Sequence, residues 1–145
     1  MFPSKTAYEG VLNDVKLPSP TDSELGILRV LWRRGPSTVR EVHEALREAS
    51  GGDAASGYTT TLKLMQIMTD KGLVVRDEAQ RAHVYAARAS EQGTQRQLVS
   101  DLLERAFGGS PAQLAMQALS TKPTSAEELA QLRQLLDSLE GEEQP

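Results

Sequence analysis

Residues 57–71 show the clearest separation of apolar from polar positions in the chain. A rotation of about 100° per residue, as in an α-helix, divides them into an inner and an outer set. The inner set is Thr61, Leu64, Met65 and Met68, and the outer set is Thr59, Thr60, Lys63, Gln66 and Asp70. The outer face begins with two hydroxyls and a lysine and has no acid before Asp70, which suits a helix that enters the DNA major groove. Most polar helix faces contact only solvent, so the neighbouring elements have to support this interpretation.

A first helix is predicted over residues 21–34. Thr21 and Glu24 have the spacing of a capping box, and the Gly-Pro pair at residues 35–36 ends the helix. Its predicted buried stripe is Leu25, Leu28, Leu31 and Trp32.

A second helix is predicted over residues 38–49, where Thr38 and Glu41 repeat the capping-box spacing. Its predicted inward residues are Val39, Val42, Leu46 and Ala49. A loop over residues 50–57, rich in Gly, Ser and Ala, then leads into the outward-facing helix. Three helices with short connections indicate a helix-turn-helix.

A β-hairpin is predicted directly after the third helix. Gly72 ends that helix, and residues 73–76 and 82–86 are expected to form two strands around a polar turn at residues 77–81. A hairpin in this position is a wing. Arg81, near its tip, is placed to reach a phosphate or a minor groove, although an arginine in such a turn more often contacts only solvent.

The residues from 90 to 139 are predicted to form three helices with apolar stripes, broken at residues 108–111. Ser125 and Glu128 cap the last of them. Helices this short cannot bury their leucines on a small domain, so we expect a homodimer, with an intramolecular helical cap as the alternative. The expected interface residues are Leu98, Leu102, Leu103, Phe107, Leu114, Leu129, Leu132 and Leu136.

The fold expected is therefore mainly α with a small β-hairpin, a winged helix-turn-helix DNA-binding domain followed by a helical dimerisation tail. The 145 residues divide into an N-terminal arm (1–20), the winged domain (21–88) and the tail (89–145). No run reaches the roughly 18 apolar residues of a membrane span, and the first twenty residues lack the apolar core of a signal peptide. We therefore expect a cytoplasmic protein with no membrane insertion.

Composition removes several classes of site. The chain has no cysteine, which excludes disulfides and thiolate metal sites, and it has only two histidines. No carboxylates, histidines or hydroxyl nucleophile cluster at catalytic spacing, so we expect no enzyme, no metal and no cofactor.

The net charge of −4 is unevenly distributed along the chain. Residues 21–88 carry ten Lys and Arg against nine Asp and Glu, whereas residues 89–145 carry four against nine. This difference favours two segments with different partners, the nearly neutral one meeting DNA phosphates. An ordinary acidic surface explains the tail almost equally well.

The order of these segments carries a resemblance to a known family. TDSELGILRVLWRRGPSTVREVHEAL, YTTTLKLMQIMTDKGLV and RAHVYAA, followed by LVSDLLERAFGGSPAQLAMQAL and SAEELAQLRQLLDSLE, resemble the bacterial penicillinase repressors, the BlaI/MecI/CopY family. The resemblance implies a homodimeric repressor that binds a palindromic, double-stranded DNA operator. It also implies inactivation by cleavage of the tail through a protease or sensor pathway, although nothing in this tail identifies a cleavage site.

Three positions depart from the family pattern. Gln80 stands where the wing usually has a glycine, Ile67 where an arginine is common on the outer face of the third helix, and Thr61 where a β-branched aliphatic residue is usual in the core. The copper-responsive members carry a C-terminal cysteine cluster, so a chain without cysteine cannot sense copper in that way.

The predicted DNA-binding residues come from three elements. Thr59, Thr60 and Lys63 are expected to address base edges and nearby phosphates. Tyr58 and Arg40 are expected to hold the helix on the DNA backbone, and Arg81 to contribute from the wing. Two alternatives stay open: a protein-interaction module, which an exposed Ile67 favours, and a repressor controlled by a small ligand.

Overall fold

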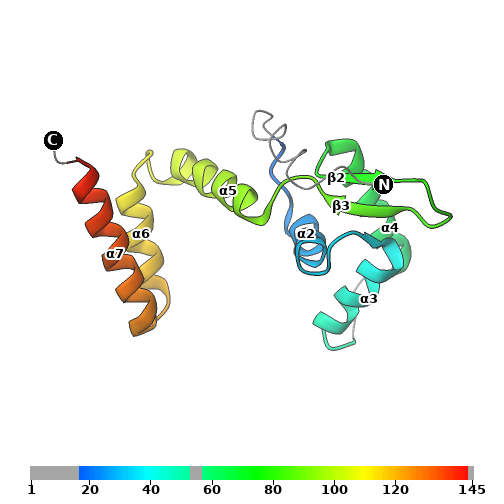
Figure 1. The fold of residues 1–145 in the computed structure, drawn as a ribbon, viewed down its shortest axis with the longest axis horizontal. Coiled ribbons are helices and arrows are strands. Elements are labelled where there is room, and N and C mark those ends of the chain that lie inside the picture. The colour runs from blue at the N-terminus through cyan, green and yellow to red at the C-terminus, as the bar shows by residue number, and fades with distance from the viewer. Residues whose placement is uncertain (1–16, 53–56, 144–145) are drawn as a thin grey trace. The chain divides into compact units, whose positions relative to one another are not determined.

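The computed structural model describes residues 17–52 and 57–143 (Figure 1), and the chain divides into two compact units between Val99 and Ser100. The first unit contains α2 (Asp22–Arg34), β1 (Ser37–Thr38), α3 (Val39–Ala49), α4 (Tyr58–Lys71), β2 (Val74–Asp77) and β3 (Val84–Ala87). Helix α5 (Glu91–Ala106) begins in the first unit and ends in the second, which also contains α6 (Pro111–Thr121) and α7 (Ala126–Glu143). Three helices and a small sheet confirm the winged helix-turn-helix.

Helix α2 begins with the predicted capping box. The Glu24 backbone N–H donates to Thr21 Oγ1 (3.2 Å), and the Thr21 N–H donates to Glu24 Oε1 (2.8 Å). Ile27 is fully buried beside Leu28 and Leu31, whereas Leu25 and Trp32 of the predicted stripe are only half-buried. The core of this helix is thus centred on Ile27, a position that the predicted stripe omitted.

Trp32 links α2 to the segment that precedes α5. Its indole Nε1–H donates to the Ala89 carbonyl at 3.0 Å, a contact between residues 57 positions apart. The indole therefore packs as a core anchor, as predicted, and its polar edge is satisfied by backbone.

Helix α3 also begins with its predicted capping box, since Thr38 Oγ1 accepts from the Glu41 N–H at 3.2 Å and Glu41 Oε1 accepts from the Thr38 N–H at 2.9 Å. Val39 and Val42 are buried and Leu46 is half-buried. The prediction that Ala49 faces inward is wrong, because this last residue of the helix lies exposed. Residues 53–56 of the predicted loop lie outside the described residues.

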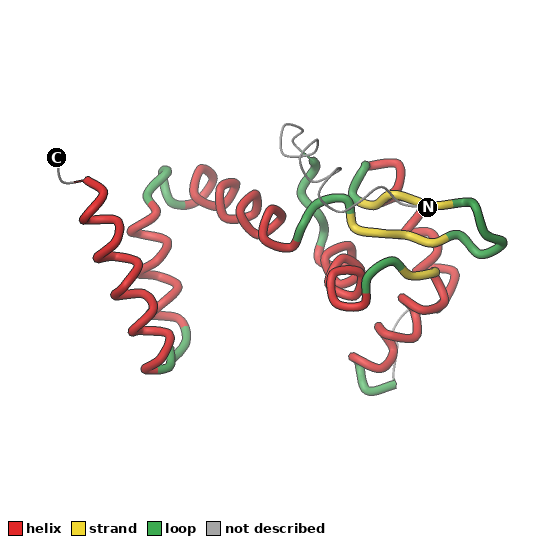
Figure 2. The backbone as a smooth tube through the Cα atoms, viewed as in Figure 1, coloured by secondary structure: helices red, strands yellow, loops and turns green. Residues whose placement is uncertain are grey.

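The sheet has three antiparallel strands in the order β1-β3-β2, where the sequence predicted only a hairpin (Figure 2). Val74 pairs with Ala87, and Asp77 pairs with Val84, so β2 and β3 form the wing. The additional strand β1 pairs Ser37 with Tyr85. It escaped prediction because it has only two polar residues, and the second of them also caps α3.

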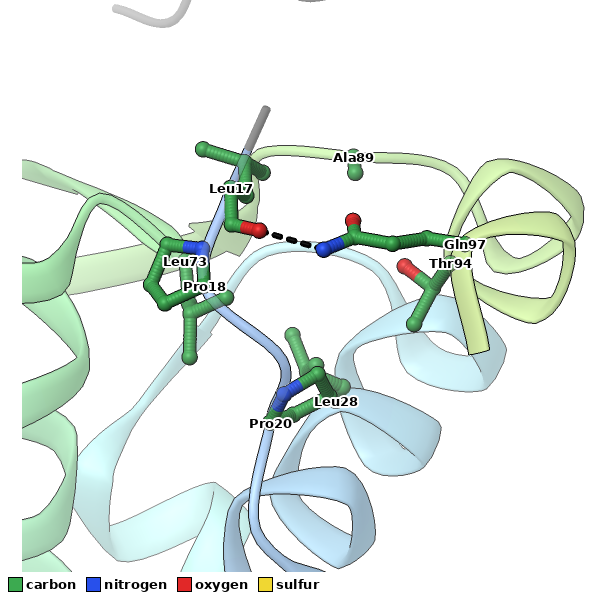
Figure 3. A pocket seen from close by; sticks show the side chains of 8 residues that line it. All are labelled: Leu17, Pro18, Pro20, Leu28, Leu73, Ala89, Thr94 and Gln97. Atoms are coloured by element: carbon green, nitrogen blue, oxygen red, sulfur yellow. Dashed lines mark hydrogen bonds between the residues drawn. The ribbon is translucent and has the colours of Figure 1, made fainter. Parts of the chain in front are cut away.

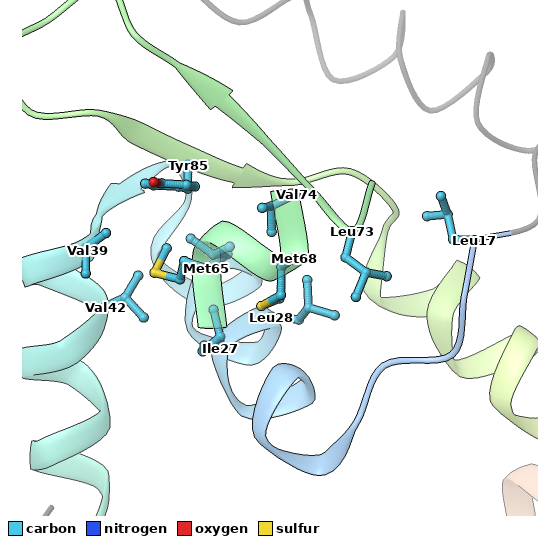
Figure 4. Close-up of a cluster of buried hydrophobic side chains, with 11 residues drawn as sticks. Leu17, Ile27, Leu28, Val39, Val42, Met65, Met68, Leu73, Val74 and Tyr85 are labelled. Carbon is cyan, nitrogen blue, oxygen red and sulfur yellow. The ribbon is translucent and has the colours of Figure 1, made fainter. Parts of the chain in front are cut away.

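The core of the first unit lies between the three helices and the sheet (Figure 4). Its buried residues are Leu17, Ile27, Leu28, Leu31, Val39, Val42, Met65, Met68, Leu73, Val74 and Tyr85. Leu17 is only 9% exposed, so the described end of the predicted N-terminal arm, residues 17–20, is not a loosely attached segment. Residues 1–16 of that arm lie outside the described residues.

The first unit also continues beyond the predicted boundary at residue 88. Thr94 is buried, and the Gln97 side-chain amide donates to the Leu17 carbonyl (Figure 3). Both residues belong to α5, so the first turns of this helix pack with the winged domain rather than with the tail.

The second unit contains the end of α5 and the other two predicted tail helices, α6 and α7. Ser110 caps α6 through the Gln113 N–H, and Ser125 accepts from the Glu128 N–H at the start of α7. Among the predicted interface residues, Leu102 and Leu136 are exposed, and the half-buried ones are Leu98, Leu103, Phe107, Leu114, Leu129 and Leu132. Across residues 17–52 and 57–143, no helix combines the length and apolarity that crossing a lipid bilayer requires.

Candidate nucleic-acid interface

Helix α4 presents a polar face that no other part of the described first unit covers. The exposed residues on this face are Thr59, Thr60, Lys63, Gln66, Ile67 and Asp70. The opposite face inserts Met65 and Met68 into the core with no exposed surface (Figure 4), and Thr61 is also buried. The predicted division of this helix into two faces is confirmed. Its exposed arc carries hydrogen-bond donors and acceptors and one cation.

An ion pair holds the C-terminal end of α4. Lys71 Nζ donates to Glu24 Oε2 at 2.8 Å, and the Glu24 side chain is only 1% exposed. Burial acts to raise the pKa of Glu24, but the hydrogen bonds from Lys71 and Thr21 outweigh it and leave the pKa below its usual value. The carboxylate therefore stays charged and ties α4 to the first turn of α2.

Gly72 directs the chain away from the end of α4 toward the wing. Its φ of 84° lies in the left-handed region, and the Leu73 N–H donates back to the Met68 carbonyl at 2.9 Å. An L side chain adopts this backbone conformation only with strain, so glycine is required at this turn.

The N-terminal end of α4 is held by side chains of α3. His43 Nδ1 lies 3.1 Å from Thr61 Oγ1, and the His43 ring meets the Tyr58 ring edge-on, with 5.9 Å between centroids. The Arg40 guanidinium lies over the Tyr58 ring, 5.7 Å from the ring centroid. Arg40, His43 and Tyr58 thus form one contact set between α3 and α4.

This contact set contains two of the six predicted DNA-binding residues. Arg40 and Tyr58 meet directly, and Thr59, Thr60 and Lys63 follow within the next two turns of α4. His43 also belongs to this contact set, although the sequence pattern did not single it out. Its spacing of three residues from Arg40 was the available signal, because that places both on one side of α3.

The sixth residue, Arg81, lies on the wing. It is exposed in the loop that joins β2 to β3, whereas Arg76 on β2 is already paired with Glu78 at 2.6 Å. The loop is ordered at its start by Asp77, whose Oδ1 accepts from the Ala79 N–H at 2.9 Å.

A small apolar cavity lies where residues 17–20 lead into α2 (Figure 3). It is lined by Leu17, Pro18, Pro20, Leu28, Leu73, Ala89, Thr94 and Gln97. It has room for about one water molecule, which is far smaller than the usual site for an organic effector. Among the described residues, His, Asp and Glu side chains do not gather in groups of three or more that are arranged to hold a metal ion.

The sequence profile of the family described as "Penicillinase repressor" matches residues 20–138, which is most of the chain. The chain belongs to the penicillinase repressor family. Transcriptional regulator BlaI of Mycobacterium tuberculosis is 34% identical over 127 residues, which span 87% of this chain and 88% of that protein. Penicillinase repressor of Bacillus licheniformis is 25% identical over 122 residues, which span 84% and 92%.

Two solved structures are also similar. One is the solution structure of the DNA-binding domain of the repressor BlaI, with a TM-score of 0.45 and 23% identity over 54% of this chain and 90% of that one. The other is a MarR family transcriptional regulator from Silicibacter pomeroyi, with a TM-score of 0.37 and 18% identity over 92% of this chain and 76% of that one.

Two departures from the usual penicillinase repressor pattern have a local explanation. The Thr61 hydroxyl is buried in the core, and its partner is His43. Gln80 lies in the loop between β2 and β3, a fully described loop in which no residue has a positive φ. This loop therefore does not need the glycine that the family usually has there. The third departure, Ile67, lies 37% exposed on the outer face of α4.

Proposed function

We propose that this penicillinase repressor family member is a transcriptional repressor that binds an operator as a homodimer, with α4 as the recognition helix. The polar face of α4 carries the proposal. Thr59, Thr60 and Lys63 are exposed on a helix that is held at both ends, by Glu24 at the C-terminus and by the α3 cluster at the N-terminus. A helix held in this way needs little further ordering of its backbone when it inserts into a major groove.

The residues divide by the kind of DNA contact that their chemistry allows. Lys63 donates to a phosphate or a guanine edge, whereas the threonine hydroxyls and methyls suit short contacts to a phosphate or a thymine. Arg40 and Tyr58 contact the backbone at the N-terminal end of α4, and Arg81 reaches a phosphate from the wing. These contacts orient the helix, and the groove-facing residues read the sequence.

Exposed apolar side chains in the tail are the argument for a homodimer. Leu102 is 45% exposed, Leu136 is 59% exposed and Met116 is 60% exposed, which leaves large apolar side chains uncovered within one chain. A second copy of the tail covers them economically, and a two-fold protein matches a two-fold operator. Cleavage in the tail by a protease or sensor pathway then releases DNA because it separates the two reading helices.

A mobility-shift experiment tests this function. The full chain is titrated onto its own promoter DNA and onto a shuffled duplex of equal composition, at a low and a high salt concentration. We expect the promoter complex to survive the higher salt while the shuffled complex is lost, since non-specific binding rests mainly on phosphate contacts. Equal binding to both duplexes at both salts contradicts the proposal.

A protein-interaction module is the second candidate, and the exposed Ile67 favours it. The same experiment separates the two, because a protein-interaction module has no preference for the promoter over the shuffled duplex.

A further inference from the structure

We propose that Ile67 reads a thymine methyl group in each half of the operator and is a specificity-determining residue. This inference rests on the proposed function and adds to it the class of base that the middle of α4 selects. Ile67 has no donor or acceptor, so its side chain can distinguish bases in a major groove only by apolar contact, and the thymine C5-methyl is the apolar group displayed there.

The position of Ile67 on α4 supports a base contact. Seven residues separate it from Thr60, which is within about 20° of two full helical turns, so the two lie on one ridge of the helix. Lys63 lies one turn before Ile67 on the same face, and all three are exposed. The isoleucine therefore lies on the outer face, between Lys63 and Thr60 in projection down the helix axis, and 37% of it is exposed.

The rise of an α-helix places Ile67 about 10 Å along the axis from Thr60. Contacts from the two residues therefore fall on different base pairs of one half-site. Thr60 addresses the pair nearest the helix N-terminus, and Ile67 addresses a pair further along the groove.

The surroundings of Ile67 favour a methyl group over a protein partner. A contiguous exposed apolar patch larger than several hundred Å² would mark a protein-interaction site. The other large apolar residue exposed on described parts of α4 is Tyr58, and its ring is engaged by His43 and Arg40. Ile67 is thus a single exposed apolar side chain among hydroxyl, amide, ammonium and carboxylate groups, which matches one methyl group.

The test begins with selection of preferred binding sites from random duplexes by the full chain. Each thymine of the selected site is then replaced by uracil in both half-sites, which removes only the methyl group and keeps the hydrogen-bonding edge. Dissociation constants are measured by fluorescence anisotropy for the wild type, for Ile67→Ala and for Gln66→Ala, a matched change on the same exposed face. Circular dichroism melting verifies that all three are folded.

We expect one symmetric thymine position at which uracil weakens wild-type binding by about fourfold per half-site, the value of one buried methyl group. Ile67→Ala should bind the thymine site more weakly and should show no further loss with uracil there. Gln66→Ala should keep the full sensitivity to uracil.

Two results overturn the inference, and they differ from failure of the proposed function. If Ile67→Ala keeps wild-type affinity, or if it responds to uracil as the wild type does, Ile67 reads no methyl group, although the selected site still establishes sequence-specific binding. If selection returns no preferred sequence, both the inference and the proposed repressor function are wrong.

Discussion

Lys71 Nζ lies 2.8 Å from a carboxylate oxygen of Glu24, and this contact joins the last residue of α4 to the first turn of α2 across 47 positions of the chain. Each charge also lies at the helix end that it stabilises, the cation at a C-terminus and the carboxylate at an N-terminus. Besides its ion pair and its favourable position at a helix N-terminus, Glu24 is also the capping-box residue of α2. One carboxylate thus caps one helix and fixes the orientation of another, the proposed reading helix.

Removal of the lysine should destabilise the first unit. Lys71→Ala leaves the buried Glu24 carboxylate without its cation, and we expect a loss of about 1–3 kcal/mol, at the lower end because the lysine is 36% exposed. Urea denaturation measures the loss. Arg34→Ala is the matched control, since it breaks an ion pair with Glu41 in which both side chains are nearly half exposed, and it should cost less than about 1 kcal/mol.

The same carboxylate should make stability depend on acid pH. The folded-state pKa of Glu24 is lowered, so its contribution is fully present above the ordinary pKa of 4.5 and is lost as the pH falls below that value. Glu24→Gln keeps a capping box and removes the charge, so its free energy of unfolding should fall less steeply between about pH 5 and pH 3. Identical slopes for variant and wild type would falsify this role of the carboxylate.

Two substitutions on the outer face of α4 should fail in different ways. If Lys63 contacts a phosphate, Lys63→Ala should weaken binding to promoter and random DNA alike and should reduce the dependence of log affinity on log salt by about one. If Lys63 contacts a base, the same change should lower only the promoter affinity, by about 1–3 kcal/mol. Thr60→Ala should mainly reduce discrimination between the two. Both side chains are exposed, so melting temperatures should hardly change. Full promoter affinity in both folded variants excludes α4 as the reading element.

A charge on the tail should separate the subunits without unfolding the chain. Leu136 is 59% exposed within one chain, so Leu136→Lys should leave the melting temperature of dilute protein nearly unchanged. If the leucine is buried between two copies, the dimer should weaken by about 1.5–3 kcal/mol per buried side chain, as sedimentation velocity would show. If the dimer is unchanged, Leu136 is not buried between the two copies.

The winged unit should need the beginning of α5 for full stability. A chain that ends at residue 99 keeps the bond from Trp32 to Ala89 and the bond from Gln97 to Leu17, whereas one that ends at residue 88 loses both. We expect the shorter chain to be less stable by about 1–3 kcal/mol, measured by urea denaturation. Equal stability of the two would show that α5 contributes nothing to this unit.

Much of the fold follows from local signals in the chain. The two capping boxes, the two faces of α4, the turn at Gly72 and the three tail helices depend on contacts between residues close in sequence, and all were predicted. The six proposed DNA-binding residues were also predicted from their places on the expected helices and wing and from side-chain chemistry. Patterns with a fixed period carry this information because a helix repeats its own geometry at every turn.

Only the tertiary structure decided the contacts between distant segments. Pairing of β1 with β3, burial of Leu17, the bond from Trp32 to Ala89 and the ion pair of Glu24 with Lys71 each join elements that no local period relates. Thr61 illustrates the difference, since a hydroxyl in the core is understood only when His43 of another helix supplies its partner. Sequence by itself therefore determined which face of α4 is free, because that depends on the order of residues along one helix. How firmly that face is held depends on partners that only the folded chain brings within hydrogen-bonding distance.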